Sequence, residues 1–267
     1  MLIKEIVNKY IGSGHNYRNA QNLAAEEILL TKIASSPLSD HVTLKGGIVM
    51  FNLTKSDRRV TQDIDFDLIR YSIEDESIRW FVEKLDSIND DISASIVGDI
   101  EKLHQEDYQG VRINLLLQDK EQSKLRIKLD IGVHTYSAIE QERIVFSFEN
   151  GNKNIQMKVN PCEQIFSEKL LSLARLGPLS TRYKDIYDLY YLIVNKLVDT
   201  SKVRDILKLF FASSNRKPND INELTDSIID TLDDKDFSKE VRSPASKWID
   251  VDYEVVKETI ISFITRI

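Results

Sequence analysis

The chain has 267 residues, 42% of them hydrophobic, which is enough for a substantial core in one large domain or two smaller ones. It has no run of about 18 apolar residues, so no membrane span is predicted, and the charged, amphipathic N-terminus MLIKEIVNKY lacks a signal-peptide core. A single cysteine, Cys162, excludes an intrachain disulfide framework and a zinc–cysteine cluster. These features predict a cytoplasmic protein.

The net charge of −7 is unevenly distributed along the chain. Residues 63–110 carry 14 acidic and 4 basic side chains, whereas residues 1–62 carry 5 acidic and 8 basic ones. The remaining residues carry 24 of each sign. The chain therefore lacks the global basic excess of a dedicated nucleic-acid binder, although a local basic patch stays compatible with it.

The first part of the chain is predicted to alternate helices with short strands. In chain order, the expected elements are a helix at 20–34, a strand at 41–44, a short helix at 48–53, a strand at 62–69 and a helix at 74–88. The strand at 41–44 leads directly into Lys45-Gly46-Gly47.

Strands dominate the next part. We predict strands at 91–97, 110–118 and 125–133, with the last two joined as a hairpin by the polar turn at 119–124. A second hairpin is expected around Gly151-Asn152, between strands at 143–150 and 153–159.

The pattern becomes helical after Asn160-Pro161. Asn160 can cap a helix, proline suits the first helical position, and Glu163 stands three residues after the cap. We therefore predict an α+β domain at 1–159 and a helical domain at 160–267, with an exposed linker at 213–223 inside the latter.

Three acids alternate with apolar residues in the predicted strand QDIDFDLI. Asp63, Asp65 and Asp67 should point to one face of this strand. Such a cluster costs free energy unless a cation neutralises it or water screens it. It indicates either a site for a hard divalent cation such as Mg²⁺ or an edge strand with a solvated acidic face. The D-x-D pattern alone favours the solvated edge.

Two further features favour the metal site. Gly46-Gly47 lies between a predicted strand and a predicted helix, where backbone amides can approach a phosphate closely, although a tight turn would also explain the pair. Asp130 lies on the polar face of the predicted strand LRIKLDIGV and can lie beside Asp63 and Asp65. Read alone, Asp130 is more simply a solvated or lysine-paired acid.

The helical part contributes a lysine to this argument. Lys169 falls within the apolar arc of the predicted helix at 160–177, so it must snorkel, pair with an acid or meet a phosphate. In the following helix, at 182–194, Asp185 borders the predicted inner face and Asp188 lies farther from it. A simple interaction with the helix N-terminus also explains Asp185.

These segments, taken in order, resemble a known family. LKGGIVMFNL and RRVTQDIDFDL, then KLDI, EQIFSEKLLSLARLG and TRYKDIYDLYYL, are similar to the AbiEii/AbiGii nucleotidyltransferase-like family, which contains toxins of type IV toxin–antitoxin and abortive-infection systems. The similarity spans about residues 40–195. It implies an α+β fold, with a DNA-polymerase-β-like nucleotidyltransferase core, a mixed sheet and a helical C-terminal part.

The resemblance also implies roles for individual residues. Nucleotide binding is assigned to Gly46, Gly47, Arg59, Thr61 and Lys169. Metal binding is assigned to Asp63, Asp65 and Asp130, and catalysis to Asp63, Asp65, Asp130, Lys169 and Asp185, with Asp188 as the second acid of the D-x-x-D segment. Many nucleotidyltransferases have Gly-Ser where this chain has Gly46-Gly47, so a hydroxyl contact to phosphate is absent there. We place Asp67 outside the core motif, at the rim.

The implied reaction uses a nucleoside triphosphate as substrate with Mg²⁺ or Mn²⁺ as cofactor. Asp130 would be a third metal ligand or the base that activates the acceptor hydroxyl. The acceptor would be an RNA, such as the 3′ end of a tRNA, or a protein hydroxyl. A cognate antitoxin is the expected partner, and no membrane is expected.

Two other interpretations stay open at the level of sequence. One is a different D-x-D enzyme, but a haloacid-dehalogenase-type phosphatase expects an apolar strand where RRVTQ stands. A glycosyltransferase expects a nucleotide-binding domain for which the 62 residues before Asp63 leave little room. The other is a non-catalytic interaction protein that keeps only the fold; the intact set of acids and Lys169 argues against it.

Overall fold

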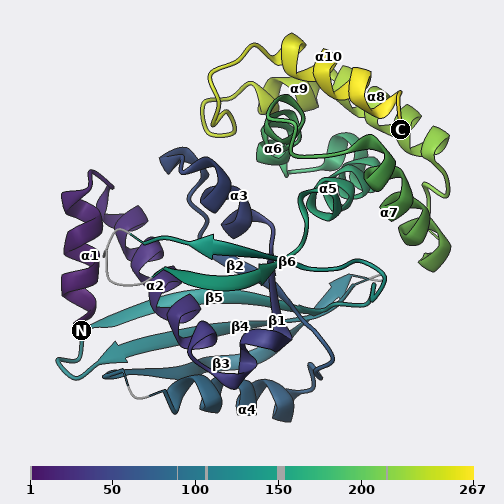
Figure 1. The fold of residues 1–267 in the computed structure, drawn as a ribbon. Coiled ribbons are helices and arrows are strands. Elements are labelled where there is room, and N and C mark those ends of the chain that lie inside the picture. The colour runs from purple at the N-terminus through teal and green to yellow at the C-terminus, as the bar shows by residue number, and fades with distance from the viewer. Residues whose placement is uncertain (1, 89, 106–107, 149–153, 215) are drawn as a thin grey trace. The chain divides into compact units, whose positions relative to one another are not determined.

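The computed structural model describes residues 2–88, 90–105, 108–148, 154–214 and 216–267. The chain divides into two compact units, Met1–Asn160 and Pro161–Ile267, and each is described by itself (Figure 1).

The first unit is built on a seven-stranded mixed sheet with the order β3-β4-β5-β2-β1-β7-β6. The strands are β1 (Val42–Lys45), β2 (Asp63–Leu68), β3 (Ile92–Gln105), β4 (Tyr108–Asp119), β5 (Lys124–Val133), β6 (Glu142–Phe146) and β7 (Ile155–Val159). β1 pairs with β7, and β2 with β5, in parallel, whereas the other neighbours are antiparallel. The sheet is therefore of the mixed kind that the family resemblance implies.

The helices of this unit lie before β1 and between the early strands. They are α1 (Ile3–Gly12), α2 (Tyr17–Ala34), α3 (Gly47–Thr54) and α4 (Asp75–Asp86), with short 3₁₀ turns η1 (Pro37–His41) and η2 (Asp57–Arg59). The Phe81 ring of α4 lies 5.8 Å from the Phe66 ring of β2. Lys32 of α2 donates to the Leu85 carbonyl at the end of α4 over 3.3 Å. Both helices thus cover the apolar face of the sheet.

The opposite face of the sheet is polar. On β5, Leu125, Ile127, Leu129 and Ile131 are buried under the helices, whereas the alternating side chains are exposed or half-buried. Because side chains alternate along a strand, this pattern places the polar residues of β2, β4 and β5 together on the face that lacks α2 and α4. The candidate site lies on that face.

The second unit is helical in its described residues. Its elements are α5 (Cys162–Leu176), the 3₁₀ turn η3 (Gly177–Leu179), α6 (Tyr183–Val194), α7 (Thr200–Ser213), α8 (Ile221–Asp233), α9 (Lys235–Val241) and α10 (Tyr253–Ile264). Aspartates accept backbone hydrogen bonds at the N-caps of α7 to α10. The rings of Phe166 on α5 and Phe263 on α10 meet at 5.0 Å in the core of this unit.

The elements expected from periodicity are present, but the structure differs in several places. The helix α1 was not expected, β6 ends at Phe146 rather than at 150, and the N-cap of α5 is Pro161 rather than Asn160. β3 continues to Gln105, past a break in register between Val97 and Glu101; the alternation is lost at that bulge, which is why the sequence predicts a shorter strand. The predicted turn at Gly151-Asn152 lies outside the described residues. In the predicted linker, Pro218 is buried and α8 already begins at Ile221. The polar residues around them led to the prediction of an exposed segment.

Candidate active site

The acids of β2 lie as predicted on the polar face of the sheet. Asp63 and Asp65 are half-buried at the start of the strand, and the buried Ile64 lies between them on the opposite face. Lys128 of the neighbouring β5 places Nζ 2.6 Å from Asp63 Oδ2. The repulsion within the acidic cluster is therefore partly offset by a lysine that follows from the parallel pairing of β2 with β5.

Asp130 lies directly beside Asp65, because the two are Cα partners in the β2–β5 ladder. Its carboxylate accepts two hydrogen bonds, each 2.7 Å long, from Nε and Nη2 of Arg112 on β4. This bidentate bond to Asp130 raises the pKa of the Arg112 guanidinium further above its usual range, with Asp63 and Glu101 adding to the shift. The arginine holds the Asp130 carboxylate in a fixed orientation.

Gly46 is required by two features at the end of β1. Its φ of 64° and ψ of −134° lie in a region that only glycine enters without strain. A methyl group at this position would also lie 2.9 Å from Asp65 Oδ2. The backbone that begins α3 therefore passes very close to a predicted metal ligand.

Gly47 makes a second close approach. A methyl group there would lie 2.9 Å from Thr61 Oγ1 and 3.3 Å from Arg59 Nη1. The Thr61 hydroxyl donates to the backbone carbonyl of Asp63 over 2.9 Å, and the Arg59 side chain is buried. The first turn of α3 is thus packed against the segment that leads into β2, with a guanidinium beside the helix N-terminus, where anions are favoured.

Asp67, which the sequence places outside the core motif at the rim, is buried in the sheet. Its side chain is only 5% exposed and forms an ion pair with Lys45, whose Nζ lies 2.6 Å from Oδ1. Asp67 is flanked in the sheet by Thr43 and Gly132, so it lies inside the sheet rather than at an edge. This burial follows from pairing on both sides of β2, which the sequence of a single strand does not reveal.

No group of three His, Cys, Asp or Glu side chains in the described ranges is arranged to hold a metal ion. Asp63 is turned to Lys128 and Asp130 to Arg112, which accounts for this arrangement. The assignment of Asp63, Asp65 and Asp130 to a metal stays a prediction.

Lys169 and Asp185 belong to the second unit and meet there. Lys169, on α5, is buried as its place on the apolar arc predicts, and its Nζ forms an ion pair with Asp185 on α6. Asp188 Oδ2 lies 2.9 Å from the same Nζ. One lysine is thus shared by two carboxylates.

Asp188 reverses the order of burial expected for α6. Its side chain is fully buried, whereas Asp185 is only half-buried. The buried residues of α6 are Ile186, Tyr187, Asp188, Leu189 and Leu192, so the inner face is rotated toward Tyr187 and Asp188 from the predicted one. The charge of Lys169 offsets the cost of burying the Asp188 carboxylate. The sequence of α6 alone does not reveal this contact.

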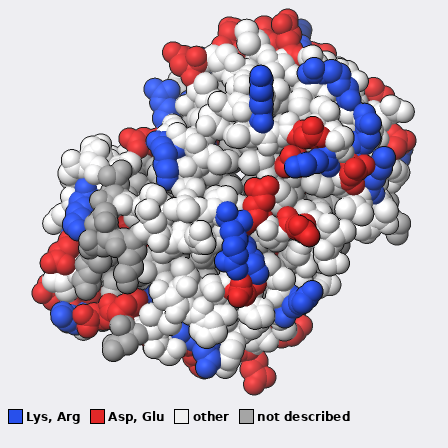
Figure 2. Space-filling model, viewed as in Figure 1, with Lys and Arg blue, Asp and Glu red and all other residues white. Residues whose placement is uncertain are grey.

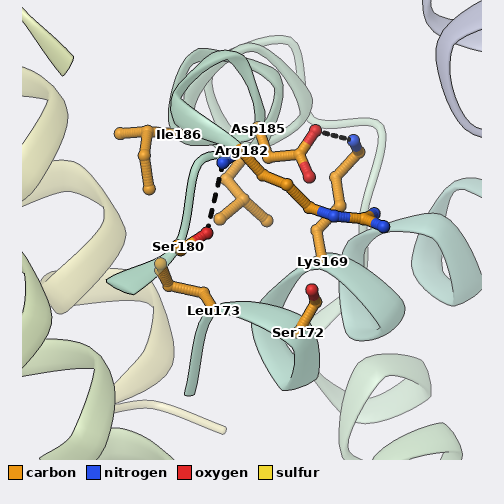
Figure 3. Close-up of a pocket in the computed structure, with 8 residues that line it drawn as sticks. Lys169, Ser172, Leu173, Ser180, Arg182, Asp185 and Ile186 are labelled. Carbon is orange, nitrogen blue, oxygen red and sulfur yellow. Dashed lines mark hydrogen bonds and ion pairs between the residues drawn. The ribbon is translucent and has the colours of Figure 1, made fainter. Parts of the chain in front are cut away.

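A shallow pocket opens beside this ion-pair group. Its lining includes Lys169, Ser172, Ser180, Arg182 and Asp185. Figure 3 shows the side chains of Arg182 and Lys169 extending toward the same end of the pocket. Arg182 donates its backbone amide to Ser180 Oγ, over 3.2 Å, and its guanidinium has no ion-pair partner among the residues that the structure describes.

Arg112, Lys128 and Arg182 are the site-lining cations that sequence reasoning did not assign. Lys128 and Arg112 both follow the strand alternation that identified Asp130, so the alternation of VRINLLLQ could have placed Arg112 on the same face. Its position opposite Asp130 depends on the β4–β5 register. Arg182 is the residue just before α6, and no periodic pattern in the sequence indicates where its side chain lies.

The sequence of this protein matches one family of known proteins over most of its length. A family model described as the nucleotidyl transferase AbiEii toxin of type IV TA systems matches residues 27–251. The chain belongs to the AbiEii family. Members of this family are nucleotidyltransferases, so membership implies a nucleoside triphosphate substrate.

Two other comparisons do not bear on the AbiEii assignment. A crystal structure of an antigenic nucleotidyltransferase-like protein from Paracoccidioides brasiliensis is 17% identical and covers 82% of this chain and 93% of its own, with a TM-score of 0.39. A search of curated proteins finds no match. In the part of the AbiEii chain that the structure describes, no helix is long and apolar enough to span a membrane.

Proposed function

We propose that this AbiEii-family toxin transfers a nucleoside monophosphate from a nucleoside triphosphate to a hydroxyl group of an RNA, such as the 3′ end of a tRNA, or of a protein. The observation that carries the proposal is the juxtaposition at the end of β1. Gly46 approaches Asp65 so closely that no side chain fits, and Asp65 lies beside Asp130 in the sheet.

The residues fit a hard divalent cation. Asp63 and Asp65 offer carboxylate oxygens on one strand face, and Mg²⁺ commonly takes one or two protein carboxylates together with substrate phosphates. When bound, Mg²⁺ or Mn²⁺ supplies polarisation of the α-phosphate and neutralises charge on the leaving pyrophosphate. Asp130 would complete the ligand set or act as base, and Lys128 and Arg112 offset the acidic charge in its absence.

The chain's own residues would then bind the triphosphate and prepare the acceptor. Gly46 and Gly47 leave the first turn of α3 open to phosphate oxygens, with Arg59 supporting it. Asp130, held by Arg112, would receive the proton of the attacking hydroxyl. The hydroxyl oxygen forms a bond to the α-phosphorus. The bond between the α-phosphorus and the oxygen that bridges it to the β-phosphate breaks, and pyrophosphate leaves with that electron pair.

The ion-pair group of the second unit has a proposed role of its own. We propose that Lys169 contacts the nucleotide and that Asp185 orients the lysine, while Asp188 compensates its charge. The support is the burial of Lys169 between two carboxylates at the rim of a pocket.

The test is transfer of label from each α-labelled nucleoside triphosphate to total RNA or total protein in the presence of Mg²⁺. The wild-type protein should label one acceptor class. Asp63→Asn and Asp65→Asn should each reduce labelling by at least about a thousandfold, because charge stabilisation of this kind accounts for several kcal/mol of the barrier.

A matched control is Glu76→Gln, which removes one exposed acidic charge from the first turn of α4. It should leave labelling unchanged. Labelling that persists in both aspartate variants would contradict the assigned roles, and absence of both labelling and nucleotide binding in the wild type would favour a non-catalytic interaction protein.

A further inference from the structure

The polar face of the sheet continues beyond the acids as a surface formed by β3, β4 and β5. The pairing registers place nine side chains on this part of the face, which we call the open sheet face: Ser93, Ser95, Val97, Asn114, Leu116, Gln118, Lys124, Arg126 and Lys128. The opposite face of the same strands holds the buried core.

The charge of the open sheet face has one sign. Three of its nine side chains are basic and none is acidic, in a chain whose net charge is −7. On the face of the molecule drawn in Figure 2, Lys and Arg are interspersed with Asp and Glu, which is the ordinary pattern of a protein surface. The acids of the same sheet face, Asp63, Asp130 and Glu101, lie in or beside the adjoining row, so the basic residues form a stretch of their own next to the candidate site.

The three cations form a line that leads to the candidate site. Lys124, Arg126 and Lys128 alternate along β5, at intervals of about 7 Å, and the next residue in this series is Asp130. Lys124 and Arg126 are exposed and form no ion pair with any described residue, whereas Lys128 reaches Asp63. Positive charge thus begins at the acidic site and extends away from it along one strand.

The neighbours of this line are neutral. Two of them, Val97 and Leu116, are apolar, and the others carry a hydroxyl or an amide. Asn114 and Ser95 are exposed and can donate hydrogen bonds to phosphate and sugar oxygens, whereas the exposed Ser93 hydroxyl donates to the Gln118 carbonyl over 3.1 Å. Aromatic rings, on which RNA-binding sheets stack bases, are absent from the nine residues of the face. The chemistry suits a sugar–phosphate backbone rather than a particular base sequence.

We propose that the open sheet face binds the phosphate backbone of a single-stranded nucleic acid acceptor and directs its terminal hydroxyl to Asp130. The inference rests on the proposed function, because it identifies the acceptor as nucleic acid rather than protein. The line of cations would be occupied by consecutive phosphates upstream of the reacting end. Lys128 would release Asp63 to the metal and turn to a phosphate.

The experiment measures binding of a fluorescein-labelled, mixed-sequence 12-nucleotide RNA by fluorescence anisotropy, at several salt concentrations and without nucleoside triphosphate. Lys124→Gln/Arg126→Gln should weaken binding roughly 10- to 30-fold at 0.1 M salt and lower the slope of log K against log salt by about 1.4, as expected for two lost phosphate contacts. The charge-reversed pair Lys124→Glu/Arg126→Glu should weaken binding further.

The matched control is Lys4→Gln/Arg79→Gln, which removes two exposed positive charges from α1 and α4. It should bind RNA as the wild type does. A single-stranded DNA of the same length should show the same loss with the Lys124/Arg126 variants, since the contacts are to phosphates.

Unchanged RNA affinity and salt slope in the Lys124/Arg126 variants would overturn the inference, as would label transfer to protein that those variants leave intact. Binding of a nucleoside triphosphate is measured in parallel on the same proteins. Nucleotide binding without RNA binding would refute the open sheet face alone, whereas loss of nucleotide binding in the wild type would refute the proposed function.

Discussion

At the scale of single residues, β2 separates acids with different roles although they share one face. The Asp63 side chain is 39% exposed and pairs with a half-exposed lysine, whereas Asp67 is 5% exposed and pairs with a lysine that is 13% exposed. A partly solvated pair contributes little to stability, and removing one partner of a buried pair leaves an uncompensated charge. The two acids should therefore respond differently to substitution.

Asp67→Ala should lower the free energy of unfolding by about 3 kcal/mol, because it leaves the Lys45 ammonium buried without its carboxylate. Asp63→Ala should change it by less than about 1 kcal/mol. Urea denaturation followed by circular dichroism measures both. Equal losses in the two variants would contradict the assignment of Asp67 to the fold and Asp63 to the reaction.

Glu26 on α2 gives a pH dependence with a definite sign. Burial raises the pKa of this carboxyl from 4.5 to about 8, against an opposing effect of Lys55. The folded state therefore keeps its proton at pH values where the unfolded state has lost it. Stability is penalised progressively as the pH rises from 4.5 to about 8, by a few kcal/mol in all.

Glu26→Gln, which is neutral at every pH, should match the wild type in thermal stability near pH 5 and exceed it near pH 8. Thermal unfolding at about pH 5 and about pH 8 checks this, with Glu76→Gln on the exposed face of α4 as the control. A gap between Glu26→Gln and the wild type that is the same at both pH values would exclude the raised pKa as its cause.

At the scale of elements, the turn from β1 into α3 sets the distance between backbone and carboxylate. Gly46→Ala should reduce nucleotide transfer by at least about a hundredfold, because alanine is strained at the positive φ of Gly46 and its methyl group would displace the Asp65 carboxylate. Gly12→Ala is a suitable control, since nothing lies within 4 Å of a methyl group there. Full activity in Gly46→Ala would show that this close approach is unimportant.

The same scale shows what periodicity predicts well. The alternation of QDIDFDLI and LRIKLDIGV correctly placed their acids on the polar faces of β2 and β5, because strand alternation is a local property. The pairing of Asp130 with Arg112, and of Asp67 with Lys45, depends on register between strands that are distant in sequence. No local pattern encodes those partners.

Helix phase was predicted less well than strand alternation. The apolar arc of α5 correctly placed Lys169 inside, but the predicted inner face of α6 left out Asp188. The burial of Asp188 is stabilised by a cation from another helix, so a rule that counts acids as polar assigns it to the surface. Buried ion pairs are the contacts that such rules miss.

At the scale of the whole molecule, the part that Lys169 plays in the fold of the second unit can be separated from its proposed contact with the nucleotide. Lys169→Met should abolish transfer if the lysine contacts the nucleotide, but it also leaves Asp188 buried without a cation, which is expected to destabilise the protein. Combining Lys169→Met with Asp188→Asn removes both charges. Thermal unfolding should show that the double variant recovers stability relative to Lys169→Met while remaining inactive in the labelling assay.

Recovery of both stability and transfer in the Lys169→Met/Asp188→Asn protein would assign Lys169 to the fold alone. The conservative Lys169→Arg variant provides the complementary readout. It keeps the charge, so it should retain stability and lose part of the transfer rate, because a guanidinium reaches a phosphate with different geometry.

The central claim is that Asp63 and Asp65 hold a divalent metal against the nucleoside triphosphate. Its most direct test is a measurement of Mn²⁺ affinity by electron paramagnetic resonance, in the presence of a non-hydrolysable nucleoside triphosphate. Tight Mn²⁺ binding is expected for the wild type and for Glu76→Gln, and loss of binding is expected for Asp63→Asn and Asp65→Asn while both variants remain folded. Wild-type Mn²⁺ affinity in those two aspartate variants would contradict it.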